Sequence, residues 1–131
     1  MNNGDGTIGV DKTQEAWLDK EISDCPKVFC LVFAHMPLNH PLSSHIMGEE
    51  NPEVASQASR LVRKFNDYKV KALFSGHIHF LCEYTLDGLN TYTDGAIFTN
   101  GSTSIPRFLK VTVTLPEIKL DKKEIWLTDK Q

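Results

Sequence analysis

Three histidines stand where predicted strands end, and imidazole is the side chain that binds transition metals most commonly near neutral pH. His35 directly follows the apolar run 28–34, and His77 and His79 follow the run 70–75. If the two runs form neighbouring parallel strands, the three imidazoles meet at the carboxyl edge of the sheet, where α/β proteins usually bind ligands. The spacing therefore predicts a metal site at this edge. The alternative, histidines that only form hydrogen bonds with protein or water, stays open.

Two further histidines, His40 and His45, lie in segment 35–50, which shows no hydrophobic periodicity and contains two prolines and a glycine. A long irregular segment inside a compact domain is usually functional or mobile. We expect both side chains to be solvated or to face a substrate rather than to bind metal.

The strands that position the three candidate ligands are predicted from uninterrupted apolar runs. Residues 28–34 contain no polar position, which predicts a strand covered on both faces and places Phe33 in the core. Residues 51–65 begin with Asn-Pro-Glu and carry apolar residues at helical spacing, which predicts a helix with one buried stripe. Used as a right-handed crossover, this helix makes the runs 28–34 and 70–75 parallel neighbours.

The rest of the chain is predicted to flank these elements. Asp11 and Gln14 form a capping-box pattern that begins a helix, which continues through Trp17, expected in the core, and ends before Pro26. After residue 76 the chain changes to antiparallel strands with tight turns. The expected strands are 80–86 and 89–93 joined by Asp87-Gly88, then 96–99 after Asp94-Gly95, then 107–115 and 124–128. We expect one mixed α/β domain over residues 1–131, with 1–10 as a loop: two buried strands with a crossover helix, then an antiparallel β meander.

Composition narrows the class of protein. The chain has 131 residues, with 14 basic and 17 acidic side chains and a net charge of −3, so it lacks the basic excess of a nucleic-acid-binding surface. No apolar run approaches the roughly 20 residues that span a bilayer, and the opening residues predict no signal peptide. The three cysteines show no paired spacing, so we expect Cys30 and Cys82 to be buried thiols and the protein to be cytoplasmic.

Several segments together resemble the C-terminal half of the calcineurin-like metallophosphoesterases. Residues 33–37 (Phe-Ala-His-Met-Pro) resemble the family's His-x-Pro strand end, and residues 74–79 (Phe-Ser-Gly-His-Ile-His) resemble its Gly-His-x-His motif. Residues 14–18 (Gln-Glu-Ala-Trp-Leu) are similar to the helix that precedes the His-x-Pro strand. Residues 94–102 resemble the strand and Gly-Ser stretch that follow the second motif.

The resemblance implies a chemistry. In that family two metals share a bridging hydroxide, which attacks the phosphorus of a phosphate ester. Carried over to this sequence, His35 and His77 would bind one metal and His79 the other. Imidazole ligands suit manganese, zinc, iron or nickel. His40 or His45 could contact the phosphate at the rim of the pocket.

The chain also departs from the family pattern. The family's Asp-x-His, Gly-Asp-x-x-Asp and Gly-Asn-His motifs are absent, and with them the bridging carboxylate and the histidine that assists the leaving group. This chain would therefore supply half of the family's αββα sandwich, one or no metal, and no catalytic residue of its own. Because the face meant for the missing half would expose apolar side chains, we expect self-association or pairing with an N-terminal half.

Three functions follow as hypotheses. The first is the C-terminal domain or fragment of a metal-dependent phosphoester hydrolase, inactive alone but belonging to an active parent enzyme. The second is a non-catalytic interaction or regulatory module that keeps the fold. The third is a mononuclear zinc site with three histidine ligands and an unrelated function.

Overall fold

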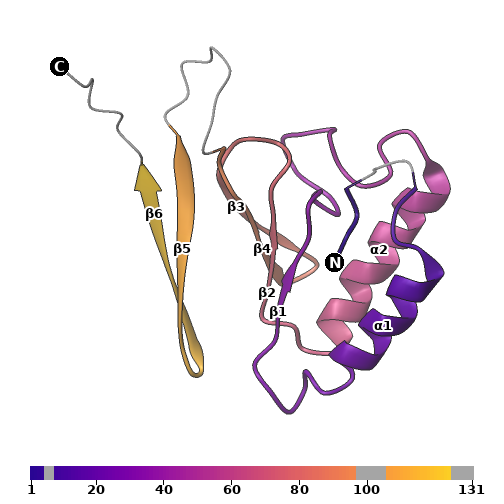
Figure 1. The fold of residues 1–131 in the computed structure, drawn as a ribbon, viewed down its shortest axis with the longest axis horizontal. Helices are drawn as coiled ribbons and strands as arrows, with labels where there is room; N and C mark the ends of the chain where they lie inside the picture. Colours follow the sequence, from indigo (N-terminus) through magenta and orange to yellow (C-terminus); the bar gives the residue numbers. More distant parts are fainter. Residues whose placement is uncertain (5–7, 97–105, 125–131) are drawn as a thin grey trace.

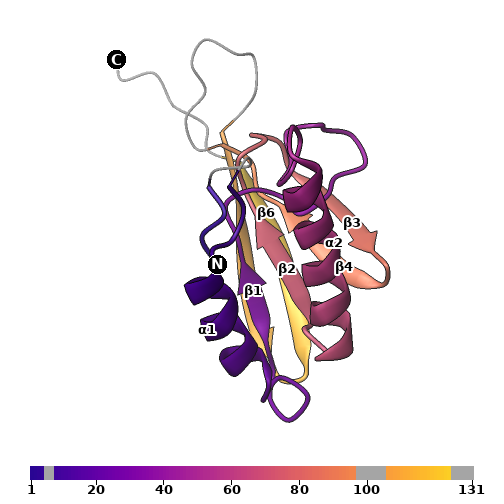
Figure 2. The same cartoon turned by 90° about the vertical axis from the view of Figure 1, so that its right-hand side faces the viewer.

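The computed structural model describes residues 1–4, 8–96 and 106–124, and shows a mixed α/β fold. The described part has two helices, a mixed four-stranded sheet and a separate antiparallel hairpin. Their bounds are α1 (Lys12–Ile22), β1 (Leu31–Phe33), α2 (Pro52–Asp67), β2 (Ala72–Ser75), β3 (Cys82–Leu86), β4 (Leu89–Thr93), β5 (Arg107–Thr114) and β6 (Glu117–Glu124). The helices cover one face of the sheet and the β5–β6 hairpin lies on the opposite side (Figures 1 and 2).

The sheet confirms the predicted neighbourhood of the two apolar runs. Its strand order is β1-β2-β4-β3, with β1 and β4 both parallel to β2. Leu31 pairs with Ala72 and Phe33 with Phe74, and α2 connects the two strands. The carboxyl ends of β1, β2 and β4 therefore lie at one edge of the sheet.

Helix α2 forms as predicted. The Asn51 side chain accepts hydrogen bonds from the backbone N–H groups of Glu53 and Val54, and Pro52 occupies the first turn, where its missing N–H has no cost. The residues of its apolar stripe are buried in the core that the sheet and α1 share: Val54, Ala58, Leu61, Val62 and Phe65.

Helix α1 begins as predicted but buries less than predicted. Asp11 accepts the N–H of Gln14, whereas the Gln14 side chain bonds to both the backbone N–H and the carbonyl of Asn2 rather than completing the capping box. Leu18 is buried, but Trp17 is 50% exposed, so its placement in the core was wrong. Trp17 is one position from the stripe that faces the sheet, and one step turns a side chain about 100° around a helix.

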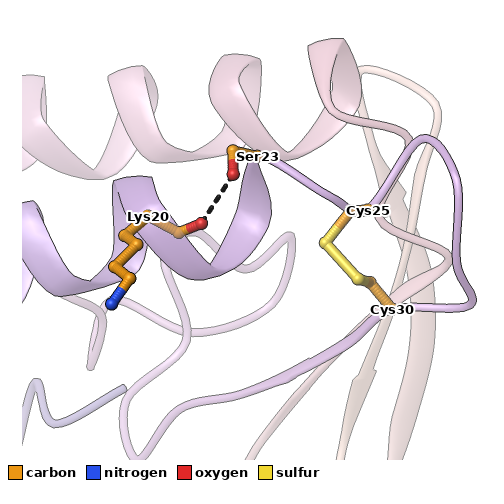
Figure 3. The surroundings of a disulfide bond; sticks show 4 residues. All are labelled: Lys20, Ser23, Cys25 and Cys30. Atoms are coloured by element: carbon orange, nitrogen blue, oxygen red, sulfur yellow. Dashed lines mark hydrogen bonds between the residues drawn. A yellow bond between two sulfur atoms is a disulfide. The ribbon is translucent and has the colours of Figure 1, made fainter.

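The segment between α1 and β1 contains a disulfide that the sequence analysis did not predict. Cys25 and Cys30 are bonded, and only Cys82 is free among the three cysteines (Figure 3). The expectation of a Cys30 thiol is therefore wrong. The Ser23 hydroxyl donates to the Lys20 carbonyl at 2.7 Å where α1 ends, so the chain leaves the helix directly into the bridged turn (Figure 3).

Strand β1 is shorter and less covered than predicted. It spans Leu31–Phe33, because the bridged turn holds Val28 outside the strand, with its N–H bonded to the Cys25 carbonyl. Phe33 is 56% exposed, which contradicts its placement in the core. The reason is topological: β2 is the one strand paired with β1 in the described residues, so this apolar run forms an edge strand.

The antiparallel part is confirmed near the sheet and corrected beyond it. β3 and β4 are joined by Asp87 and Gly88, both with positive φ (49° and 94°), as a two-residue hairpin turn requires. β6 begins at Glu117, directly after a turn at Leu115-Pro116, and not at the predicted residue 124. Most of the predicted strands 96–99 and 124–128 lies outside the described residues.

The hairpin covers part of the sheet face that was expected to be bare. Phe33, Phe74 and Tyr92 stack across β1, β2 and β4, with ring centroids 5.1 Å apart in each pair. Leu109 and Val111 of β5 line the same cleft as Phe33 and Phe74. Phe74 is buried, so exposure of this face is concentrated at β1.

The search for membrane spans finds no helix in the described residues that is long and apolar enough to cross a bilayer.

Candidate metal centre

The candidate site lies at the carboxyl edge of β1 and β2, where His35 and His77 meet. The His35 Nε2 and His77 Nδ1 atoms are 3.1 Å apart, and the two rings are nearly perpendicular, with an interplanar angle of 71°. Gly76 donates its N–H to the His35 carbonyl at 2.9 Å, which holds the two strand ends together beyond the last paired residues. The sequence prediction that these two histidines converge is confirmed.

Asn3 fixes the backbone on the His35 side. Its side chain is buried, and its Oδ1 accepts the N–H groups of His35 (2.9 Å) and Met36 (3.0 Å). Its Nδ2 donates to the Met36 carbonyl at 2.9 Å. Asn3 thus acts as a positioning residue for the chain that carries His35. No local pattern could reveal it, because its partners lie more than 30 positions along the sequence.

On the β2 side of the site, the chain turns through His77 and His79, which have positive φ of 65° and 59°. A positive φ is unfavourable for a residue with a Cβ, and such residues cluster at functional sites. His79 is exposed; it lies near enough to His77 to lower the pKa of that imidazole, but the ring contact and hydrogen bond at this edge join only His35 and His77. The structure therefore brings together two of the three predicted ligands.

The protonation state of His77 suits ligation. Burial is the largest effect and lowers the pKa of His77, and the nearby His35, His45 and His79 lower the pKa further. Glu49 acts in the opposite direction. A lowered pKa keeps the imidazole neutral, and neutral imidazole is the form that binds metal.

The separation of the two nitrogens fits a shared metal. Two imidazole nitrogens at about 2.0–2.1 Å from one ion lie roughly 2.9–3.4 Å apart for bond angles between about 90° and 109°. The observed 3.1 Å falls within that interval, and it is also the length of an ordinary hydrogen bond between the two rings, which the neutral imidazoles form without a metal. The described residues contain no group of three or more histidines, cysteines and acids able to hold a metal, so His35 and His77 form an incomplete ligand set.

The loop between β1 and α2 carries the two remaining histidines, His40 and His45, in different surroundings. His45 is exposed, and its Nδ1 contacts Glu49 Oε2 at 3.1 Å. His40 is buried, with 6% of its surface exposed, and packs against Phe80 and Tyr84. The expectation that His40 is solvated is therefore wrong, because two aromatic side chains from the β3 side cover it.

A cleft of about 300 Å³ adjoins His35 and extends between the sheet and β5. Its walls include Phe33, Phe74 and Leu109, and Asp94 lies at its polar end. The Asp94 carboxylate accepts the N–H of Gly95 at 2.8 Å, and burial raises the pKa of Asp94 despite backbone hydrogen bonds that lower it.

The sequence analysis missed two charged residues near this edge, Asp94 and Glu49. Asp94 directly follows β4, which is parallel to β2, so the rule that selected His35 and His77 also selects Asp94 once β4 is known to join the sheet. Glu49 had no such signal, because its proximity to His77 depends on the path of an irregular loop.

A scan against protein-family models and a search of curated proteins find no match to this chain.

Proposed function

We propose that the chain is the C-terminal part of a metal-dependent phosphoester hydrolase of the calcineurin-like type. The observation that carries the proposal is the 3.1 Å approach of His35 Nε2 to His77 Nδ1 at the carboxyl edge of two parallel strands. In this proposal His35 and His77 hold one metal, and His79, two residues beyond His77, holds a second. Manganese, zinc, iron and nickel all suit imidazole ligands.

Two features of the chain support metal binding in this proposal. His77 is kept neutral by burial and by the surrounding imidazoles, so its nitrogen lone pair is available near neutral pH. Asn3 holds the backbone at His35. A bound metal would supply an activated water and would polarise the phosphate oxygens of the ester substrate.

A complete site needs ligands from outside the described residues. The described part lacks a third ligand beside His35 and His77, and a two-metal site also needs a bridging carboxylate. We propose that a partner segment, from an N-terminal half or a second copy, supplies them. Support comes from β1, which is paired on one side in the described residues and whose own Phe33 is 56% exposed.

The outer edge of β1 pairs with no strand of the described residues and is suited to accept such a segment. The Met1 amine donates to the Phe33 carbonyl at 2.7 Å, so one outward-facing group of the strand already bonds a backbone nitrogen that is not part of the sheet. Trp17 is 50% exposed next to the same edge, and both aromatic side chains line one groove. An added strand would displace Met1 from the Phe33 carbonyl, bury these side chains and pair the outer edge of β1.

Substrate contacts would come from the exposed loop histidine. His45 lies close enough to His77 to lower its pKa, and it is open to solvent, so it could reach a phosphate at the rim. His40 is buried, and we do not assign it to the substrate.

Cobalt(II) binding tests the ligand assignment, because its visible absorption reports both the ion and its coordination. We expect the chain to bind cobalt. His35→Ala and His77→Ala should each lose at least tenfold in affinity for cobalt. Ile78→Val, a change between the proposed ligands His77 and His79, should bind cobalt as the parent does. Parent-like cobalt binding by both histidine variants would contradict the proposal.

His79→Ala separates the proposal from a mononuclear site with three histidine ligands. In the two-metal assignment, His79→Ala leaves the first cobalt bound by His35 and His77 largely unchanged. In a three-histidine site, the variant loses that cobalt as completely as His77→Ala does. A chain that binds no cobalt at all would favour a non-catalytic module.

A further inference from the structure

His40 is a buried imidazole that the proposed metal site does not use. It lies in the loop between β1 and α2 and contacts two aromatic rings edge-to-face: Phe80, with centroids 5.1 Å apart, and Tyr84, with centroids 4.7 Å apart. Its 6% exposure makes it one of the few polar side chains of the described residues that are almost fully buried. A buried imidazole can bind a second proton only if the structure around it changes to accommodate the charge.

The hydrogen bonds of His40 specify one neutral form. Its Nδ1 accepts the backbone N–H of Leu42 at 3.1 Å, so the ring proton of the neutral imidazole resides on Nε2. Nε2 is buried and has no hydrogen-bond partner in the described part of the chain. Protonation of the ring would place a second proton on Nδ1, facing the Leu42 donor, and would leave a cation buried with an unpartnered N–H.

Within the described ranges, no charged group compensates for that cation. The titratable group in contact with His40 is Tyr84 of β3, whose hydroxyl donates to the Asn39 carbonyl at 2.7 Å. Burial, with a smaller effect of Cys82, raises the pKa of Tyr84 well above its usual range, so Tyr84 stays neutral. The other contacts, Phe80 and the backbone of the loop itself, are uncharged. Burial alone lowers the pKa of His40.

We propose that His40 is an acid-sensitive latch for the 38–46 loop: the neutral ring holds the loop against β3, and the protonated ring releases it. The latch uses no metal and goes beyond the function proposed above. Its release would have two effects. Leu38 and Ile46 would leave one wall of a cavity of about 340 Å³ that they form with Val62 of α2. His45 would move away from the neighbourhood of His77.

The direction and steepness of the response follow from linkage. A released His40 is solvated and titrates near 6.5, whereas the latched ring titrates lower. Below about pH 6.5 the released loop therefore binds the proton more tightly, and the ratio of released to latched loop rises by up to about tenfold per pH unit. Above that pH the ratio no longer depends on the protonation of His40, and the latched loop has its largest share.

Amide hydrogen exchange followed by NMR tests the latch. The protection factor of the Leu42 amide, which corrects for the intrinsic effect of pH, is measured from about pH 7.5 to about pH 5 and compared with that of Leu61 in α2. We expect Leu42 to lose at least tenfold in protection while Leu61, fully buried in the core, keeps its own. Equal losses at both positions would mean global unfolding and would overturn the proposal.

Two variants that cannot titrate complete the test. His40→Phe keeps a ring between Phe80 and Tyr84, and His40→Asn keeps an acceptor for the Leu42 N–H; neither variant should show the loss of Leu42 protection in acid. His45→Asn, in the same loop but exposed, should show the parent's profile. Acid release that persists in both His40 variants would overturn the proposal. If neither variant folds, the ring signals of His40 in the parent decide: their titration must coincide with the loss of Leu42 protection, and titration without that loss overturns the latch.

Discussion

Phe65 and Phe33 differ in burial, and this difference predicts that truncation of each to alanine lowers the free energy of unfolding by a different amount. Both are phenylalanines in apolar stretches, and the sequence analysis placed both in buried elements. In the structure Phe65 of α2 is 0% exposed, whereas Phe33 of β1 is 56% exposed. Truncation of each to alanine removes the same atoms from different surroundings.

The expected magnitudes follow from burial. A fully buried phenylalanine truncated to alanine costs about 3–5 kcal/mol, which includes the cavity left behind. Phe33 has less than half of its surface buried and lies at an edge that water can fill, so its truncation should cost about 1–2 kcal/mol. The free energy of unfolding of Phe65→Ala should thus lie about 1–4 kcal/mol below that of Phe33→Ala.

Urea denaturation followed by circular dichroism measures this difference, provided that the slope m is the same for both variants. Trp17→Ala is the matched second case, because Trp17 is 50% exposed beside the same edge and should also lose less than Phe65→Ala. Equal losses for Phe33→Ala and Phe65→Ala at low protein concentration would refute the assignment of β1 as an uncovered edge strand.

Three further predictions concern the backbone, the half-buried Asp94 and the disulfide. Gly48→Ala should lower the free energy of unfolding by about 3 kcal/mol or more, because φ is +89° and a Cβ would lie 2.2 Å from the backbone of α2. Gly88→Ala, with φ +94° and open space around it, should lower it by only about 1–2 kcal/mol. Thermal melts of the two variants measure the difference. Burial raises the pKa of Asp94, so the folded state holds this proton more tightly than the unfolded state and Asp94 lowers stability as pH rises above about 4. Asp94→Asn should therefore gain stability relative to the parent at pH 7 and lose that advantage near pH 3; urea midpoints that differ equally at both pH values would contradict this. Replacement of both Cys25 and Cys30 by serine should cost about 2 kcal/mol, the chain-entropy value for so short a loop, and calorimetry of the parent with and without reductant provides the control.

Much of the fold was predictable because the relevant signals are local. The Asn-Pro-Glu start of α2 and its apolar stripe at helical spacing specify a helix and its buried face without reference to the rest of the chain. Asp87 and Gly88 specify the β3–β4 hairpin in the same way, since few other residue pairs adopt two successive positive φ values.

The errors concern properties that depend on distant residues. The run 28–34 predicts a strand, but not that the strand has one neighbour in the described residues, so the exposure of Phe33 could not be predicted. The start of β6 at Glu117 was missed because the Leu115-Pro116 turn was not recognised, although Ile118 and Leu120 alternate with polar residues as a half-buried strand requires.

In the candidate site, too, features set by local sequence were predictable and features set by distant residues were not. The meeting of His35 and His77 was predictable, because strand ends and a crossover helix determine it. The role of Asn3 was not, since it depends on hydrogen bonds between segments far apart in the sequence. The burial of His40 was not predictable either, because Phe80 and Tyr84 reach it from the β3 side of the sheet.

The central claim is that His35 and His77 bind metal, and the metal content of the native protein tests it most directly. Elemental mass spectrometry is applied to protein purified without an affinity tag or added metal, and to His77→Ala prepared in the same way. The account predicts about one transition metal per chain in the parent, or about two where a partner completes the site, and a loss of bound metal in the variant. A parent that contains no metal, or a His77→Ala variant that retains all of it, would contradict the account.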